Sequence, residues 1–324
     1  MVNYSIILGN LGNTCDRFLS SGYKSAVDIE RQFEMASKLP LVSGVELVGN
    51  WDISCKNINQ VNKLLRHYNF KCVSIIPDLF AQQKYGKGSL TAKDPAVRKT
   101  ALNEIKEVMD IASELGCSII NLWPGQDGYD YCLQSDYIKE RQWFADAVAD
   151  CAAYKKDIKI SLEYKIKEPR THSYLARVSD TIVTIKQIGA PNVGVTIDVG
   201  HAFMAYENVA ESVALLKMSG DLLYHMHFND NFSHWDDDMI VGSVHLPEYI
   251  ELLLWLRKTG YNGWYSMDQY PYRENAFNAL SESILFLNQI DQNLTKDRIN
   301  AFESLITEGD ATKAVKFIRE AFLK

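Results

Sequence analysis

Eight short apolar segments recur along the first 290 residues, and each is followed by a stretch with helical periodicity. β-Branched and aromatic residues are common in the apolar segments, which favours strands. We expect strands at 4–8, 44–48, 70–76, 117–123, 158–163, 193–198, 222–228 and 264–268. We expect the helices that follow them at 26–39, 58–67, 96–115, 137–154, 175–188, 209–218, 247–259 and 274–290. Eight strand-then-helix units in a chain of this length are typical of a (β/α)8 TIM barrel, a fold of the α/β class.

The first predicted turn argues against the competing architecture, an open doubly wound sheet. Such a sheet usually opens with a glycine-rich turn that binds phosphates and is spaced G-x-G-x-x-G. The turn here, Gly9-Asn10-Leu11-Gly12-Asn13, lacks that spacing. We therefore predict a catalytic barrel over residues 1–290. Two further amphipathic patterns, at 294–306 and 311–322, predict additional C-terminal helices in an extension over 291–324, packed on the barrel or on a neighbouring subunit.

Charge and apolar run length exclude two classes of partner. The formal net charge is −7, whereas a nucleic-acid-binding protein needs a basic face for phosphates. The longest apolar run, near residues 252–256, is far shorter than the roughly 20 residues of a membrane span. The first residues show no signal-peptide pattern, and the 6 cysteines are scattered without a C-x-x-C pair. We expect a cytoplasmic protein with reduced thiols that binds neither nucleic acid nor membranes.

Acidic residues and histidines stand at the ends of four consecutive predicted strands. In a barrel these strand ends meet at one mouth, where the chemistry takes place. The fifth to eighth strands deliver Glu163, Asp198, His227 and Asp268 to that mouth. His225 lies on the same strand face as His227, so the register decides which of the two faces the mouth, and we favour His227.

The charge at this rim predicts a metal site. Three neighbouring carboxylates repel one another and raise one another's pKa unless a cation lies among them. We therefore predict a divalent metal bound by Glu163, Asp198, His227 and Asp268. Oxygen-rich ligation with one imidazole favours Mn²⁺, Mg²⁺ or Co²⁺ over a thiolate-type zinc site.

The segment that follows the fifth strand carries more charge than a buried strand would. Glu163 and Lys165 are two residues apart, so they project from the same face of an extended chain. Glu168 and Arg170 follow in the turn, where Pro169 ends regular strand pairing. A carboxylate beside an ammonium group at a strand end suits proton transfer or metal binding.

Two motifs resemble known sugar isomerases. Residues 163–170, Glu-Tyr-Lys-Ile-Lys-Glu-Pro-Arg, are similar to the E-P-K-P-x-E-P-R segment of xylose isomerases, and residues 197–201, Ile-Asp-Val-Gly-His, resemble the I-D-x-G-H strand end of ketose 3-epimerases. This resemblance to the xylose-isomerase-like superfamily implies a divalent metal, often Mn²⁺, on Glu163, Asp198, His227 and Asp268. It also implies that Glu163 and Asp268 move the substrate proton and that His201 contacts the sugar. Asp268 departs from the family, which usually has Glu at this position.

A narrower resemblance covers residues 123–131 and 236–245, which are similar to the catalytic α subunit of bacterial C-glycoside deglycosidases. That resemblance implies a small β subunit as partner and a 3-oxo-C-glycoside as substrate. The first of these segments contains Gln126 and Tyr129. Together the patterns predict five substrate-binding residues, namely His201, Glu168, Arg170, Gln126 and Tyr129.

We expect a sugar isomerase or epimerase in which Glu163 removes the proton next to a sugar carbonyl and the metal stabilises the resulting enediolate. Asp268 or Lys165 would return the proton or polarise the carbonyl. Elimination by a C-glycoside deglycosidase is the alternative, and a silent sugar-binding subunit or an AP-endonuclease-like phosphodiesterase is less favoured. The expected partners are a sugar or sugar conjugate and either a second copy of the chain or the small β subunit.

Six other acidic residues are expected to have structural roles. Asp127 and Asp130 are predicted to be turn residues, because they lie around Pro124-Gly-Gln-Asp-Gly128. The run Asp236–Asp238 is expected to be a solvated loop or a helix cap rather than a second cation site. Glu46, within the second predicted strand, is expected to be a buried carboxylate whose hydrogen bonds are satisfied.

Overall fold

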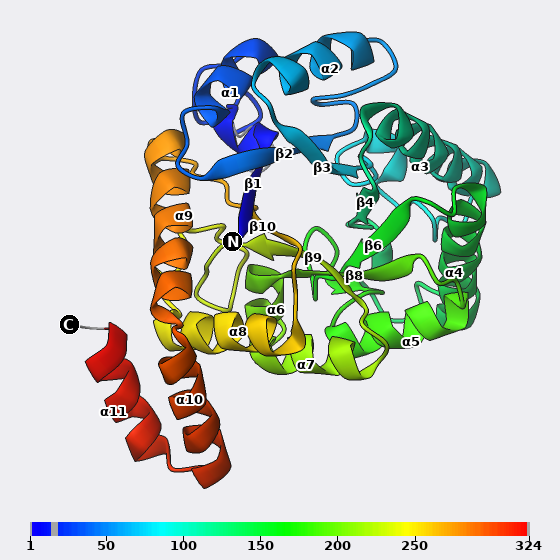
Figure 1. Cartoon of the computed structure of the whole chain (residues 1–324). Coiled ribbons are helices and arrows are strands. Elements are labelled where there is room, and N and C mark those ends of the chain that lie inside the picture. Colours follow the sequence, from blue (N-terminus) through cyan, green and yellow to red (C-terminus); the bar gives the residue numbers. More distant parts are fainter. Residues whose placement is uncertain (1, 14–18, 323–324) are drawn as a thin grey trace.

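Eight parallel strands close into a barrel in a computed structural model that describes residues 2–13 and 19–322 (Figure 1). The order of the strands around the barrel is β1-β10-β9-β8-β6-β4-β3-β2. Their bounds are β1 Asn3–Ile7, β2 Val42–Val48, β3 Lys71–Ile76, β4 Ile119–Leu122, β6 Lys159–Glu163, β8 Val193–Asp198, β9 Leu223–Phe228 and β10 Trp264–Met267. All eight predicted strands are present, so the predicted (β/α)8 class is confirmed.

Helices surround the barrel and cover the outer face of its sheet (Figure 1). Their bounds are α1 Ile29–Ala36, α2 Ile58–His67, α3 Pro95–Leu115, α4 Tyr137–Tyr154, α5 Val178–Ile188, α6 Val199–Met204, α7 Val209–Met218, α8 Leu246–Thr259 and α9 Ala276–Asn293. Two 3-10 turns, η1 Leu8–Leu11 and η2 Gln83–Tyr85, lie in the loops after β1 and β3. The apolar core fills the space between sheet and helices, and fully buried Phe33, Phe144, Leu253 and Leu280 are among its members. Their burial is the main favourable term in folding.

The ends of α3 illustrate how local sequence sets the helix bounds. The Asp94 side chain accepts a hydrogen bond from the backbone N–H of Ala96, and Pro95 occupies the first helical turn, where no N–H is needed. At the other end Gly116 adopts a left-handed conformation with φ of 68°, which glycine adopts without steric cost.

Three features lie outside the predicted pattern. Strands β5 (Gly128–Tyr129) and β7 (His172–Ser173) form a small antiparallel sheet, and each is too short for period-two alternation to reveal it. Helix α6 begins directly after β8, and the Asp198 side chain caps it. Helix α9 continues three residues past the predicted boundary at residue 290.

The C-terminal extension consists of α10 (Lys296–Glu308) and α11 (Ala311–Phe322), which extend away from the barrel beside α8 and α9 (Figure 1). Phe302 is buried and packs edge-on against Phe317, and Lys258 on α8 pairs with Glu303 at 3.3 Å. The two predicted C-terminal helices are therefore present. Their expected contact with a neighbouring subunit stays a prediction.

Within the described residues, no helix combines the length and the hydropathy needed to cross a bilayer. The described cysteines, Cys55, Cys72, Cys117, Cys132 and Cys151, are free thiols, while Cys15 lies outside the described residues.

The interior of the barrel carries a layer of polar residues. TIM barrels usually fill this space with branched apolar side chains. Here each barrel strand contributes at least one polar residue that is fully buried. In chain order these residues are Ser5, Glu46, Ser74, Asn121, Ser161, Thr196, His225 and Ser266. Seven of them hydrogen-bond to one another in two groups, and Ser5 is the exception. Burying polar groups costs free energy unless they are bonded, so these two groups, hereafter the polar floor, need a physical account.

Candidate active site

A cavity of about 1030 Å³ lies at the carboxyl ends of the barrel strands. Glu163, His201, Asp268, Lys165 and Gln126 all line it. These residues come from elements far apart in the sequence, and the barrel topology brings their strand ends to one mouth. The cavity is therefore the candidate active site.

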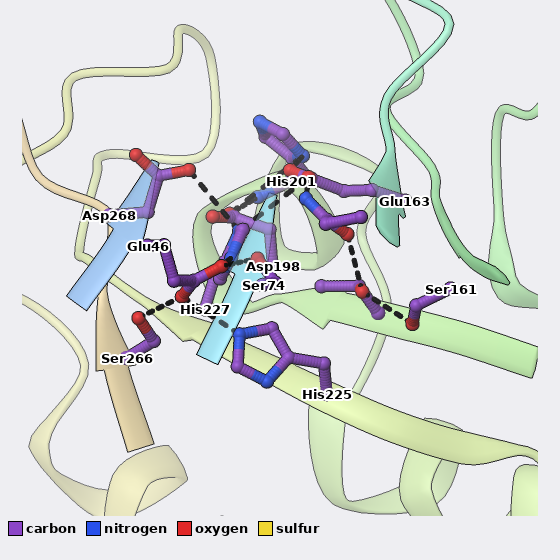
Figure 2. A network of polar contacts seen from close by, with 12 residues as sticks. Glu46, Ser74, Ser161, Glu163, Asp198, His201, His225, His227, Ser266 and Asp268 are labelled. Atoms are coloured by element: carbon purple, nitrogen blue, oxygen red, sulfur yellow. Dashed lines mark hydrogen bonds and ion pairs between the residues drawn. The ribbon is translucent and has the colours of Figure 1, made fainter. Parts of the chain in front are cut away.

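The four predicted metal ligands lie together in this mouth. Glu163 ends β6, Asp198 ends β8, His227 is on β9, and Asp268 follows β10 by one residue (Figure 2). Each offers one ligand atom, and these atoms all lie within 4.8 Å of one another. His227, rather than His225, faces the acids, since its Nδ1 lies 3.5 Å from Glu163 Oε2 and 3.3 Å from Asp268 Oδ2. The structure thus places His227, and not His225, beside the acids.

The donor set fits a divalent cation. Three carboxylates and one imidazole are typical ligands of hard or borderline dications such as Mn²⁺ and Mg²⁺. The Nδ1 atom of His227 is buried and makes no hydrogen bond of good geometry, although it faces two carboxylates. A buried histidine nitrogen that faces acids without a hydrogen bond is expected of a metal ligand whose missing partner is the ion.

Two of the predicted ligands, Glu163 and Asp198, are held by neighbours that are not themselves ligands. Asn121 on β4 donates to Glu163 Oε2 at 2.6 Å, and Asn229 donates to Asp198 Oδ2 at 2.9 Å. The other oxygen of Asp198 accepts from the backbone N–H of His201 at 2.8 Å. These bonds leave the carboxylates little rotational freedom, which pre-organises the site for a ligand.

The carboxyl groups of the site differ in the direction in which their pKa values are shifted. Burial raises the pKa of Asp198 to about 7, with the neighbouring acids adding to the effect and His201 opposing it. Burial also raises the pKa of Asp268, although His227 lowers it. Burial acts on Glu163 in the same direction, but His227 and then His201 outweigh it, so the pKa of Glu163 is lowered. The protein environment therefore shifts the pKa values of Glu163 and Asp268 in opposite directions, so Asp268 holds a proton more readily than Glu163 does.

Gly200 explains why the motif at residues 197–201 contains glycine. A Cβ atom on Gly200 would lie 2.0 Å from Asn229 Oδ1, so only glycine leaves room for the amide that holds Asp198. The same amide donates to the carbonyl oxygen of Asp268 at 2.8 Å. Gly200 thus allows one side chain to fix the positions of two predicted ligands.

We expect Gly200→Ala to weaken the site and the fold together. Displacing Asn229 breaks two buried hydrogen bonds and strains the packing, which should lower the free energy of unfolding by about 1–3 kcal/mol. Urea denaturation and Mn²⁺ titration would measure the two effects. Gly9→Ala is the matched control, because no atom lies within 4 Å of a Cβ at that position. Equal Mn²⁺ affinity in the Gly200 variant and the wild type would contradict this account.

The Asp236–Asp238 run is not a solvated loop, contrary to the expectation from sequence. Asp236 and Asp238 are buried and line the cavity. Asp236 Oδ2 accepts from Lys165 Nζ at 2.7 Å and lies 3.2 Å from His201 Nε2. Burial alone would lower the pKa of His201, but Asp198 and Asp236 raise it to about 9. Lys165 and His201 are both buried, and each needs an anionic partner. The need for such a partner is the signal from which the burial of Asp236 could have been predicted.

Asp236 could be mistaken for part of a second metal site. Ligand atoms of Asp198, His201 and Asp236 come within 4.8 Å of one another. The ammonium of Lys165 already neutralises Asp236, and it also pairs with Glu168 at 3.0 Å. The existing cation argues against an ion at this place.

Four of the five predicted substrate-binding residues line the cavity: Gln126, Glu168, Arg170 and His201. Tyr129 does not, which corrects the prediction. The pairing of β5 with β7 places the Tyr129 ring parallel to His172, with 4.7 Å between the ring centroids. Aromatic contacts with His172, Tyr137 and Tyr174 account for Tyr129 as a packing residue.

The remaining acidic positions have structural roles, as expected. Asp127 is buried and accepts backbone and hydroxyl hydrogen bonds from Ser89 and Thr91, so it ties two loops together. Asp130 accepts from the backbone N–H of Thr171 and pairs with Arg170 at 3.0 Å. These contacts position the loop that carries Arg170 at the cavity.

A closed (β/α)8 barrel with acids and imidazoles converging on its mouth is the scaffold of many enzymes with different chemistries. This chain belongs to the xylose isomerase-like TIM barrel family, whose sequence profile matches residues 33–290.

Sequence relatives lie among the xylose isomerases. The xylose isomerase of Thermus thermophilus is 30% identical over 222 residues, which cover 67% of this chain and 57% of that protein. The xylose isomerase of Dinoroseobacter shibae is 32% identical over 186 residues, covering 54% of this chain and 42% of that protein. The matches thus span only about half of the length of these xylose isomerases.

Solved structures share the fold at lower sequence identity. A D-tagatose 3-epimerase-like protein has a TM-score of 0.69 and 22% identity, covering 91% of this chain and all of that one (100%). A D-psicose 3-epimerase from Clostridium cellulolyticum H10 has a TM-score of 0.70 and 16% identity, covering 90% and 99%. At such identity the similarity establishes the common barrel and nothing finer.

Proposed function

We propose that this protein is a divalent-metal-dependent sugar isomerase or epimerase. The observation that carries the proposal is the convergence of Glu163, Asp198, His227 and Asp268, of which Glu163 and Asp268 line the cavity. A divalent cation bound by these four residues, most simply Mn²⁺, would act as a Lewis acid toward a sugar carbonyl and its neighbouring hydroxyl. Relatives described as xylose isomerases support this substrate class.

The side chains divide the proton transfer between them. Glu163, whose pKa is lowered, is the base that removes the proton next to the carbonyl. Asp268, whose pKa is raised, lies within reach of His227 and is the acid that returns a proton. Return to the neighbouring carbon gives isomerisation, and return to the opposite face gives epimerisation.

Other lining residues hold the sugar. His201 lies 3.2 Å from Glu163 Oε1, so its ring borders the place where the reacting carbon would lie. Lys165 is fixed by Asp236 and Glu168 and directs an ammonium toward the cavity, where it would bind a hydroxyl or polarise a carbonyl. Gln126 and Arg170 would bind the outer hydroxyls.

Elimination is a second candidate function, favoured by the size and composition of the cavity. A volume of about 1030 Å³ lies at the upper end for pockets that hold drug-sized ligands and exceeds what a free monosaccharide needs. The rings of Trp51, Phe80 and Trp123 form a continuous row along it, with centroid distances of 5.6 and 4.8 Å. Such a row would pack against a planar aglycone. In a 3-oxo-C-glycoside, the same base would remove the C2 proton, the bond from C1 to the aglycone carbon would break, and Asp268 would protonate that carbon. This is the reaction class of C-glycoside deglycosidases, with a small β subunit as partner.

Solvent deuterium incorporation tests the proposal. The Mn²⁺-loaded protein should exchange the proton next to the carbonyl when free ketoses or 3-oxo-glycosides are incubated in D₂O and followed by ¹H NMR. Exchange into ketoses supports isomerase or epimerase activity, and release of an aglycone supports elimination. Tight sugar binding without any exchange would contradict both. Size-exclusion chromatography would test the proposed self-association.

A further inference from the structure

Glu46 lies at the centre of one part of the polar floor, next to His227 (Figure 2). Its Oε1 accepts from His225 Nε2 at 2.8 Å and from the Ser266 hydroxyl. Its Oε2 lies 3.2 Å from His227 Nε2 and accepts from the Ser74 hydroxyl. Both oxygens therefore bond two partners each, supplied by strands β3, β9 and β10.

This bonding determines which nitrogen of His227 points into the cavity. A carboxylate only accepts hydrogen bonds, so it favours a proton on the imidazole nitrogen that faces it. Nε2 faces Glu46, and Nδ1 faces Glu163 and Asp268. A cation bound by those two carboxylates would displace a proton from Nδ1 but not from Nε2, so the Nδ1 lone pair would bind the ion. A ring that donates one N–H to a carboxylate also becomes a better ligand through its other nitrogen.

Glu46 cannot itself serve as a ligand of the predicted ion. Its oxygens lie on the far side of the His227 ring from the acids, and four donors already occupy them. Its ligand atoms do approach those of His225 and His227 within 4.8 Å, but these are hydrogen-bonded pairs. We propose that Glu46 is a positioning residue, which orients His227 and keeps its proton on Nε2 so that Nδ1 binds the divalent metal; the proposal rests on the function proposed above.

The alternative is that the Glu46 cluster only satisfies buried polar groups. The two accounts differ in a measurable way. A Glu46 with a purely structural role would affect folding but not which nitrogen of His227 is protonated. Glu46→Gln keeps the shape of the side chain and replaces one acceptor oxygen by an NH₂ group. That group would donate to one of the two imidazoles and favour a proton on its Nδ1 instead.

Mn²⁺ affinity provides the test, measured by electron paramagnetic resonance of free Mn²⁺ at constant pH. Glu46→Gln is expected to weaken binding about 10–100-fold, the typical cost of losing a partner of a metal-bound histidine. Asp52→Asn is the matched control, since Asp52 is also a buried carboxylate but accepts from the backbone of Val48 instead of from an imidazole. Its Mn²⁺ affinity should equal that of the wild type.

A second pair of variants tests the same role if Glu46→Gln fails to fold. Ser74→Ala removes only the hydroxyl that donates to Glu46 Oε2, and several-fold weaker Mn²⁺ binding is expected. Ser5→Ala is its control, because Ser5 is equally buried on a barrel strand and its hydroxyl has no hydrogen-bond partner.

The ¹⁵N spectrum of labelled histidine in the Mg²⁺-loaded protein reports the protonated nitrogen directly, with assignment from a His227 variant. The wild type should show His227 protonated on Nε2, and Glu46→Gln should shift part of the population. Wild-type protein that binds Mn²⁺ while Glu46→Gln and Ser74→Ala bind it equally well would overturn the positioning role alone. Wild-type protein that binds no Mn²⁺ would instead overturn the proposed metal-dependent function.

Discussion

Replacing Glu163 with Gln should lower kcat about 10³-fold while the fold persists. The pKa of Glu163 is lowered, so this carboxylate is ready to accept a proton, and a general base of this kind typically contributes 10²–10⁴-fold. Gln has nearly the same shape and can still accept the hydrogen bond from Asn121, so the barrel should keep its stability. The rate of deuterium exchange into substrate, followed by NMR, measures the loss.

Glu163 is both the proposed base and a proposed metal ligand, and two comparisons distinguish the loss of one role from the loss of the other. The variant should be assayed at saturating Mn²⁺, where weaker metal binding no longer limits the rate. Glu207→Gln serves as the control, because Glu207 is a partly buried carboxylate that bonds Tyr164 and the backbone of Val178 away from the cavity. Wild-type exchange by Glu163→Gln at saturating metal would show that Glu163 is not the base.

Removing divalent metal with EDTA should abolish activity and lower the melting temperature. The acids of the cluster repel one another once the cation leaves, and burial intensifies this repulsion, as the raised pKa of Asp198 indicates. A ligand present at 100 times its dissociation constant stabilises the native state by about 2.7 kcal/mol, which corresponds to several degrees. Thermal denaturation with Mn²⁺, Mg²⁺, Co²⁺ or Zn²⁺ added back would rank the ions.

The same measurement on Asp198→Asn shows where the stabilisation originates. That variant has lost one predicted ligand, so added Mn²⁺ should raise its melting temperature much less than it raises that of the wild type. A metal-free protein with undiminished activity would contradict the proposed mechanism. An equal rise in both proteins would place the ion elsewhere.

The barrel and the four clustered residues could be predicted from the sequence, because both follow from the regular alternation of strands and helices along the chain. Strands of the barrel are short apolar runs separated by helical stretches, and the residues near the end of each late strand could be found by counting. Asp198 and His227 were located in this way, and the structure brings them together. The strand-end residues of a parallel barrel can be placed at a common mouth without knowing any tertiary contacts.

The features that sequence reading missed depend on contacts between distant segments. Asp236 follows no strand end, and its burial results from Lys165 and His201, which lie 71 and 35 residues away. Tyr129 was misplaced because it lies in the two-residue strand β5, where it pairs with His172 of β7, a contact between distant segments that no local pattern encodes. Individual serines such as Ser74 also carry no signal, since an isolated serine within a strand is common.

The polar floor has a consequence for protein engineering. In a barrel lined with hydrocarbon, side chains can be exchanged one at a time for others of similar volume. Under this cavity, a single apolar replacement leaves its former partners without a hydrogen bond, so one change costs more than several compensating changes made together. Grafting this mouth onto another barrel should therefore succeed only if Glu46 and its four donors are transplanted with it as one unit.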